Sequence, residues 1–256
     1  MTTGPERGVP VVVVPCYNEE HRLDPDRFLA LARTGRVVLL FVNDGSTDGT
    51  AQVLAGLATA DGVGVIELAV NVGKAEAVRR GLLRAIDDGA SVVGYYDADL
   101  STPPDELLRL VDVVAARPDR AAVLASRVAR LGSDIERSAV RHYLGRVFAS
   151  AASAALGARV YDSQCGAKLF RVTPSLVAAV GEPFRSAWGF DVELLHRLLA
   201  GWGGAAPLAP EAFVEVPLGA WSAGQGSRVT VGAAVSAFTS VMSILCRRML
   251  GGRNRT

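Results

Sequence analysis

Short apolar runs separated by helical stretches dominate the first half of this 256-residue chain. The runs are rich in Val, Leu and Ile and span residues 9–14, 37–42, 64–68, 91–96 and 121–125. Unbroken apolar runs of about four to eight residues are typical of strands buried on both faces, as in parallel sheets. Strands that alternate with helices predict an α/β fold with a mainly parallel, Rossmann-like sheet sandwiched by helices.

Helix-start signals lie between these runs. Asp24-Pro25 places an N-cap carboxylate before a proline and predicts a helix over 26–33, and Thr102-Pro103-Pro104-Asp105 predicts one over 106–116 in the same way. Further helical stretches cover 50–58, 75–86, 139–156 and 191–199. Between the last two we expect a turn-rich segment at 161–170, and residues 213–218 alternate enough to form one more strand.

Polar motifs follow four of the predicted strands. They are Pro15 to Glu20, Asn43 to Asp48, Asn71 to Lys74 and Asp97 to Asp99. The carboxyl ends of parallel strands meet at one edge of a sheet, where ligands of such folds bind. We therefore expect these four loops to converge, although they are distant in sequence.

Asp97-Ala98-Asp99 places two carboxylates one residue apart where the run 91–96 ends. Hard cations such as Mg²⁺ and Mn²⁺ favour carboxylate oxygens and usually share their coordination shell with substrate phosphates. The pair therefore predicts a metal on Asp97 and Asp99 and a nucleotide-diphosphate substrate. A polar strand-to-helix turn is the alternative interpretation.

Composition and charge narrow the function classes. The formal net charge of +1 disfavours a nucleic-acid binder, which usually has a strong basic excess. Cys16, Cys165 and Cys246 match no zinc or disulfide spacing, which favours a reducing cytosol. The chain starts without the pattern of a secretory signal. We expect a cytoplasmic protein.

Several motifs resemble those of family 2 glycosyltransferases. They are Val-Pro-Cys-Tyr-Asn-Glu-Glu at 14–20, Val-Asn-Asp-Gly-Ser-Thr-Asp-Gly-Thr at 42–50, Asn-Val-Gly-Lys at 71–74 and Asp-Ala-Asp-Leu-Ser-Thr-Pro-Pro at 97–104. Two more, Asp-Ser-Gln-Cys-Gly-Ala-Lys-Leu-Phe at 162–170 and Trp-Gly-Phe-Asp-Val-Glu-Leu-Leu at 188–195, resemble the branch of dolichyl-phosphate glucosyltransferases and polyprenyl-phosphate glycosyltransferases. The resemblance covers about residues 9–230. It implies a glycosyltransferase A-type fold and inverting, metal-dependent transfer of a hexose from a UDP- or GDP-sugar to a polyprenyl phosphate. A lipid acceptor implies a peripheral position at the inner face of the cell membrane.

The resemblance also implies a set of residues that bind the nucleotide-sugar and its Mg²⁺ or Mn²⁺. Pro15, Tyr17, Asn18 and Glu19 would line the base and ribose pocket. Asp44 would accept a hydrogen bond from the edge of the base, and Lys74 would lie near the base or the diphosphate. For Asp44 the alternative is an Asx-type turn over 43–50. Ser101 replaces a glutamine found in many mannosyl relatives, which disfavours mannose. The implied donor-site residues are Pro15, Tyr17, Asn18, Glu19, Asp44, Gly73, Lys74, Asp97, Ala98 and Asp99.

On the acceptor side, the resemblance implies that Arg127 and Arg141, with help from Arg137, bind an acceptor phosphate, because guanidinium groups suit phosphate oxygens. A solvated basic helix face is the alternative. Asp162 is the first candidate and Asp191 the second for orienting or deprotonating the acceptor, while Asp99 acts through the metal. A lipid phosphate is already largely anionic, whereas a hydroxyl acceptor needs a true base. Asp191 is equally well interpreted as an N-cap of the helix that follows it.

The chain divides into a catalytic domain at 1–228 and a C-terminal amphipathic helix with a basic tail at 229–256. Within the domain, about 9–127 would bind the donor and about 128–228 the acceptor. Polar residues interrupt the stretch 229–246, so we do not expect it to span a membrane. Its apolar stripe suits an anionic membrane surface, the catalytic domain or a second subunit of a homodimer. The stripe consists of Val231, Val235, Phe238, Met242, Leu245 and Met249.

Two other functions stay open on the sequence. The first is the same chemistry on a soluble hydroxyl or amine acceptor, in secondary metabolism or surface-glycan synthesis. The second is a nucleotide-sugar-binding regulator that has the fold without catalysing transfer, which the intact carboxylate pair disfavours.

Overall fold

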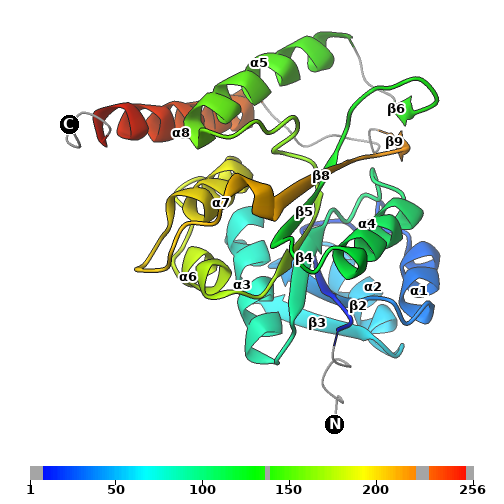
Figure 1. The fold of residues 1–256 in the computed structure, drawn as a ribbon. Coiled ribbons are helices and arrows are strands. Elements are labelled where there is room, and N and C mark those ends of the chain that lie inside the picture. Colours follow the sequence, from blue (N-terminus) through cyan, green and yellow to red (C-terminus); the bar gives the residue numbers. More distant parts are fainter. Residues whose placement is uncertain (1–7, 136–138, 223–230, 252–256) are drawn as a thin grey trace.

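The structure is a computed structural model that describes residues 8–135, 139–222 and 231–251. A seven-stranded sheet lies between two layers of helices (Figure 1). The strand order is β3-β2-β1-β4-β7-β5-β8, and every strand is parallel to the others except β7, which runs antiparallel to both of its neighbours. A short second sheet pairs β6 with β9. The strands are β1 (Val11–Cys16), β2 (Val38–Asp44), β3 (Val63–Leu68), β4 (Val92–Tyr96), β5 (Ala122–Ser126), β6 (Asp134–Ile135), β7 (Ala167–Arg171), β8 (Phe213–Pro217) and β9 (Ala220–Trp221).

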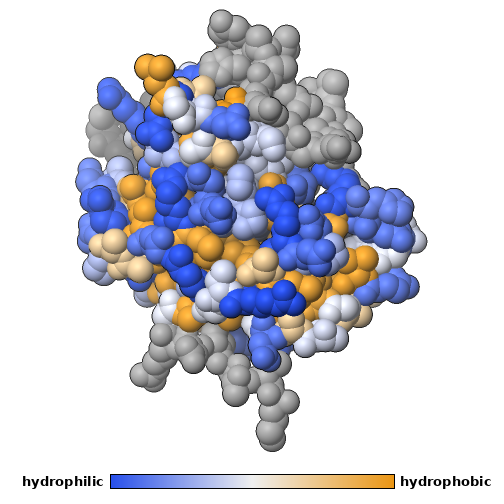
Figure 2. Space-filling view, turned by 90° about the vertical axis from the view of Figure 1, so that its right-hand side faces the viewer, coloured by the Kyte–Doolittle hydropathy of each residue, from blue (hydrophilic) through white to orange (hydrophobic). Residues whose placement is uncertain are grey.

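Two hydrophobic cores lie on opposite faces of the sheet. Neighbouring residues of a strand point to opposite faces, so Val12 and Val14 of β1 pack with α1, α2 and α4, while Val11 and Val13 pack toward α3 and, beyond it, α5 to α8. From the α1 and α4 side the surface is mainly hydrophilic, with smaller hydrophobic areas between (Figure 2). The helices are α1 (Pro25–Arg33), α2 (Thr50–Leu57), α3 (Lys74–Asp87), α4 (Pro104–Ala116), α5 (Ala139–Leu156), α6 (Pro174–Gly181), α7 (Phe190–Ala200) and α8 (Val231–Gly251), and η1 (Pro210–Ala212) is a 3₁₀ turn.

The predicted α/β architecture is confirmed, and the predicted strands and helices of the first half all form. The Asp24 side chain caps α1 by accepting from Arg27 N at 3.1 Å, as expected for an N-cap. At α4 the N-cap is Pro103 and makes no side-chain cap, so only the proline at the first helical position follows the prediction.

Besides the short elements β6, η1 and β9, the strand β7 and the helix α6 were not predicted. The segment 161–170, expected to be turn-rich, runs into the strand β7, and Lys168 in that strand is fully buried. A lysine inside a short apolar run is typical of a surface segment, which hides the strand. Helix α6 has clear signals, because the Thr173 hydroxyl accepts from Leu176 N at 3.2 Å and Pro174 is its first residue.

Helix α8 packs on α5 and α7 with a face next to the predicted apolar stripe. In the part of α8 whose side chains are described, Ala237, Val241 and Ile244 are buried, whereas Phe238 and Met242 of the predicted stripe are exposed. Packing on the domain, one of the three interpretations of this stripe, therefore does not hold for Phe238 and Met242. Within the described ranges we find no helix with the length and apolar content that a membrane span requires.

Candidate functional site

The loop after β1 is joined to the loop after β2. Asn18 Oδ1 accepts from Thr47 N at 2.8 Å, and Thr50 Oγ1 accepts from Glu19 N at 2.8 Å. Asn18 has a left-handed backbone (φ +50°), which asparagine tolerates better than most residues. The backbone of the first predicted motif is thus held in place by the second.

The loop after β2 contains the Asx-type contacts that the alternative interpretation of this segment predicts. Asn43 Oδ1 accepts from Ser46 N at 3.2 Å, and Asp48 Oδ1 accepts from Thr50 N at 3.0 Å at the start of α2. Asp44 makes neither contact, so the local turn does not explain its carboxylate.

Asp44 instead holds the loop before α3. Its side chain is buried, and its two oxygens accept from Val72 N at 2.7 Å and Gly73 N at 2.9 Å. Gly73 has φ +90°, a backbone conformation that favours glycine, and Lys74 follows as the first residue of α3. The buried carboxylate therefore fixes the position from which Lys74 extends. Contact between Asp44 and a nucleotide base stays a prediction.

Lys74 and Arg22 connect these loops to the carboxylate pair after β4. Lys74 Nζ donates to Asp97 Oδ1 at 2.6 Å. Arg22 lies 3.3 Å from Glu19 Oε1 and 3.5 Å from Asp99 Oδ2, measured from its two terminal nitrogens. The four predicted loops therefore form a closed ring of contacts at one edge of the sheet, and their predicted convergence is confirmed.

Lys74 is surrounded by negative charge. Burial lowers the pKa of its ammonium group, but the charges of Asp97, Asp191 and Asp99 raise it more, so that the pKa lies above the ordinary lysine value. Lys74 is therefore a fixed positive charge at neutral pH, directly beside the carboxylate pair. Such a charge suits the phosphates of a nucleotide.

The donor atoms at Asp97 and Asp99 fit a hard divalent cation. Their side chains are 32% and 25% exposed, so they are accessible from the surface. A Cβ on Gly166 would lie 2.0 Å from Asp97 Oδ2, so the space beside that oxygen exists only because residue 166 is glycine. No cluster of three or more His, Cys, Asp or Glu within the described ranges could hold a metal alone. Mg²⁺ and Mn²⁺ are commonly bound by one or two carboxylates together with substrate phosphates, and two carboxylates are what Asp97 and Asp99 offer.

On the acceptor side, Arg127 and Asp162 lie in direct contact. Arg127 Nε and Nη2 donate to the two Asp162 oxygens at 2.6 and 2.7 Å, and Arg127 N donates to Oδ2 at 3.0 Å. Gln164 N adds a further bond to Asp162 Oδ1 at 3.2 Å. The Arg127 guanidinium also lies 5.3 Å from the centre of the Trp221 ring. The structure thus joins a predicted phosphate-binding residue and the first candidate base into one bidentate pair.

Asp191, the second candidate base, lies in the first turn of α7 and is buried. It accepts from Tyr95 Oη and from Lys168 Nζ, and Lys168 also donates to Cys165 O at 2.6 Å. Burial, and then the Asp191 charge, raises the pKa of Tyr95 far above its ordinary value, which keeps the phenol a donor. The N-cap of α7 is Gly189 without a side-chain cap, so the N-cap interpretation of Asp191 is wrong.

Other predicted residues are placed less completely. Tyr17 is exposed, Pro15 is half-buried and Ala98 is buried, and their donor contacts stay predictions. Arg137 lies outside the described residues, and Arg141 lies in α5 with its side chain outside them. Sequence reasoning missed Arg22, which has no characteristic spacing, and left the buried Lys168 unassigned.

Comparison with protein families gives one match that covers most of the chain. The family described as Glycosyl transferase family 2 matches residues 11–175.

Curated relatives match over part of their length. The chain is 30% identical over 168 residues to an undecaprenyl-phosphate 4-deoxy-4-formamido-L-arabinose transferase of Pseudomonas fluorescens (strain SBW25), covering 63% of this chain and 46% of the relative. It is 35% identical over 210 residues to a dolichyl-phosphate beta-glucosyltransferase of Drosophila melanogaster, covering 72% of this chain and 61% of the relative. The chain thus spans about half the length of the first of these relatives and about three fifths of the second.

Among solved structures, glucosyl-3-phosphoglycerate synthase from Mycobacterium tuberculosis in complex with UDP is similar, with a TM-score of 0.66 and 23% identity, covering 94% of this chain and 79% of that chain. The same synthase with Mn²⁺, UDP-glucose and phosphoglyceric acid has a TM-score of 0.66 and 22% identity, again over 94% and 79%. At this identity the likeness establishes the fold alone.

Proposed function

The chain belongs to glycosyl transferase family 2, and on that premise we propose that it transfers a hexose from a UDP- or GDP-sugar to a polyprenyl phosphate with inversion at the sugar. The observation that carries the proposal is the closed ring of four loops, with Lys74 and Asp97 in contact at 2.6 Å. Support for the acceptor comes from the names of the two curated relatives, which refer to undecaprenyl phosphate and dolichyl phosphate.

In the proposed donor site, Asp97 and Asp99 would hold Mg²⁺ or Mn²⁺, and the M. tuberculosis synthase crystallised with Mn²⁺ and UDP-glucose supports that choice. The bound metal would act as a Lewis acid that stabilises negative charge on the departing diphosphate. Lys74, which contacts Asp97, could exchange that carboxylate for a phosphate oxygen of the donor. Arg22, which lies beside Asp99, could do the same.

On the acceptor side, Asp162 fixes the direction of Arg127. Nε and Nη2 of Arg127 are bonded to Asp162, which leaves Nη1 to bind an acceptor phosphate, because Nη1 makes no hydrogen bond to the described residues. Within the described residues, four donors already contact the Asp162 oxygens, so we assign Asp162 the task of orienting Arg127. A phosphate acceptor is largely anionic at neutral pH and needs little help from a base.

Variants of Arg127 and Asp162 can distinguish a phosphate acceptor from a hydroxyl acceptor. Arg127→Ala is expected to lower kcat/KM for a polyprenyl phosphate about tenfold to a hundredfold, because it removes the phosphate contact. Asp162→Asn keeps one oxygen that can accept from Arg127 and is expected to cost less. The measurement is transfer kinetics with a polyprenyl phosphate and with the matching prenyl alcohol. A greater loss in Asp162→Asn than in Arg127→Ala would instead assign Asp162 as a base for a hydroxyl acceptor.

Gly166→Ala is expected to weaken Mn²⁺-dependent UDP binding about tenfold or more, because the added methyl group would displace the Asp97 carboxylate from the position it needs. Calorimetric titration of UDP, with Mn²⁺ and with a chelator, measures the effect. Gly56→Ala is the matched control, since a Cβ at this position in α2 meets no described atom within 4 Å. Equal UDP binding by the two variants would contradict the assignment of Asp97 as a metal ligand.

The proposed activity as a whole is tested by nucleotide release. UDP- and GDP-sugars are offered with Mn²⁺ or chelator, and with a polyprenyl phosphate, a small soluble phosphate or no acceptor. Release that requires both the metal and the polyprenyl phosphate supports the proposal, whereas release only with the soluble acceptor overturns the lipid assignment. A nucleotide-dependent thermal shift without release under any condition would identify a regulator that binds nucleotide-sugar.

We further propose that the C-terminal helix contacts the inner face of the cell membrane from the cytoplasm. Phe238 and Met242 of α8 and Val147 of α5 are exposed, and α8 packs on α5. Exposed apolar side chains of this size suit the boundary between headgroups and acyl chains. Such contact would bring the acceptor half to a lipid carrier.

A further inference from the structure

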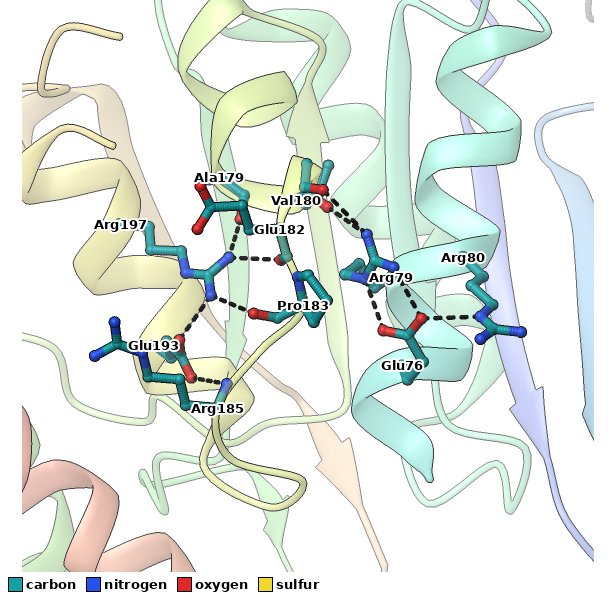
Figure 3. Close-up of polar contacts among 11 residues, drawn as sticks. Glu76, Arg79, Arg80, Ala179, Val180, Glu182, Pro183, Arg185, Glu193 and Arg197 are labelled. Atoms are coloured by element: carbon teal, nitrogen blue, oxygen red, sulfur yellow. Dashed lines mark hydrogen bonds and ion pairs between the residues drawn. The ribbon is translucent and has the colours of Figure 1, made fainter. Parts of the chain in front are cut away.

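A fully buried arginine ties α7 to the loop that precedes it, residues 182–189. Arg197 Nη1 donates to Ala179 O at 2.7 Å and to Glu182 O at 2.8 Å, and Nη2 donates to Pro183 O at 2.7 Å (Figure 3). Nη2 also donates to Glu193 Oε1 at 2.8 Å, one turn earlier in α7. With 1% of its surface exposed, this side chain fixes the carboxyl end of α6 and the start of the loop against α7.

Glu193 holds the middle of the same loop. Its Oε2 accepts from Arg185 N at 2.9 Å and from Ser186 N at 3.4 Å. Ser186 Oγ in turn accepts from Gly189 N at 2.8 Å, at the N-cap of α7. Because Glu193 is buried, Arg197 is also the cation that offsets its charge.

The far end of the loop reaches the candidate site. The carbonyl of Trp188 accepts from Gln164 Nε2 at 3.3 Å, two residues from Asp162. Trp188 itself is 36% exposed. Asp191 follows in the first turn of α7, where it contacts the buried Lys168. Displacement of the loop would therefore move Trp188 and the start of α7 together.

We propose that Glu193 and Arg197 are positioning residues for the acceptor half, which they serve by holding the loop 182–189 and hence Trp188 and Asp191. Neither residue touches a reacting atom in this proposal. The role rests on the proposed sugar transfer, because it states what the held loop does for that reaction. An error of about 1 Å in the placement of reacting groups can lower a rate about a hundredfold.

Arg79 offers a matched comparison at the same helix end. From α3, its Nη1 donates to Val180 O at 3.2 Å and to Gly181 O at 3.3 Å, and its guanidinium pairs with Glu76 (Figure 3). It therefore caps the same carbonyl end of α6 as Arg197 does. In the described part of the chain, Arg79 makes no hydrogen bond to the loop 182–189. A variant at Arg79 disturbs α6 and leaves the loop contacts in place.

The experiment compares Arg197→Met with Arg79→Met by hydrogen exchange and kinetics. Arg197→Met is expected to speed amide exchange across 182–190 about tenfold or more and to lower kcat/KM for the acceptor by a similar factor. UDP binding with Mn²⁺ should stay within about twofold, because no contact to the donor loops is removed. Arg79→Met should leave both exchange at 182–190 and acceptor kinetics within about twofold. Arg197→Lys, which keeps the charge beside Glu193, should recover part of the loss.

If Arg197→Met does not fold, Glu193→Gln makes the same test. It keeps the size of the side chain, but only one of its two polar end atoms can still accept, so either the bonds from Arg185 N and Ser186 N or the bond from Arg197 Nη2 is lost. Unchanged exchange at 182–190 would overturn the positioning role, whatever the enzyme transfers. Equal kinetic losses in Arg197→Met and Arg79→Met would also overturn it, because they would reflect stability alone. A wild-type protein without transfer would end the proposed function, while the exchange result would still report on the loop.

Discussion

Replacing Asp97 with asparagine is expected to lower kcat/KM for sugar transfer about 10³-fold. The amide removes the negative charge that would bind the metal, and Lys74, which lies 2.6 Å away, loses its charged partner. The loss falls on the step in which charge develops on the diphosphate, so it should appear in kcat as well as in donor binding. The fold should persist, since the Asp97 side chain is about one-third exposed.

Steady-state transfer rates and calorimetric UDP binding, each with Mn²⁺ and with chelator, measure this effect. Asp112→Asn is the matched control, because it neutralises an exposed carboxylate that pairs with Arg36 on the surface. That control should stay within about twofold of the wild type, as surface ion pairs contribute little. If the transfer rate of Asp97→Asn remains within about fivefold of the wild type and still responds to Mn²⁺, Asp97 is not the metal ligand.

The four loops of the proposed donor side were largely predictable from the sequence because topology places them. Each of the four loops follows a strand, and parallel strands bring their carboxyl ends to one edge whatever lies between them in the chain. The prediction therefore needed only the order of the apolar runs. Asp44, Lys74 and Asp97 all lie at the edge of the sheet that this strand order predicts.

The proposed acceptor side was less predictable because long-range ion pairs build it. Arg127 and Asp162 were assigned separate tasks, and only the fold shows them as partners across 35 residues. Lys168 made β7 look like part of a turn-rich segment, because nothing local indicates that Asp191 will neutralise it. The sequence indicates a buried ion pair most directly when the two partners are close in the chain, whereas Lys168 and Asp191 are 23 residues apart.

The two sides meet at Asp97 and Lys74. The backbone N–H of Asp97 donates to Gly166 O at 2.9 Å, so the loop with Asp97 and Asp99 is attached to the segment that contains Asp162. The charge of Asp191 acts on Lys74 together with those of Asp97 and Asp99. A single cluster of alternating charges therefore runs from the donor loops to α7, and changes at Asp191 should affect more than one part of it.

Asp191→Asn is expected to reduce the free energy of unfolding by about 3 kcal/mol and to lower transfer more than a hundredfold. Stability falls because the fully buried Lys168 ammonium loses the negative charge beside it. Chemical denaturation gives the first quantity, and kcat/KM per folded enzyme gives the second. These two losses need not have the same cause, so the single variant cannot distinguish a structural Asp191 from a catalytic one.

The double variant Asp191→Asn with Lys168→Met separates the two causes. Without the lysine no buried charge is left unpaired, and the asparagine oxygen can still accept from Tyr95 Oη, so stability should return to within about 1 kcal/mol of the wild type. If Asp191 orients or deprotonates the acceptor, transfer stays low in this stable protein. Recovery of transfer together with stability would show that Asp191 serves only to neutralise Lys168, and the acceptor phosphate would then react without a protein base. Lys168→Met alone completes the cycle, since it leaves the Asp191 carboxylate in place and shows whether the lysine contributes to transfer on its own account.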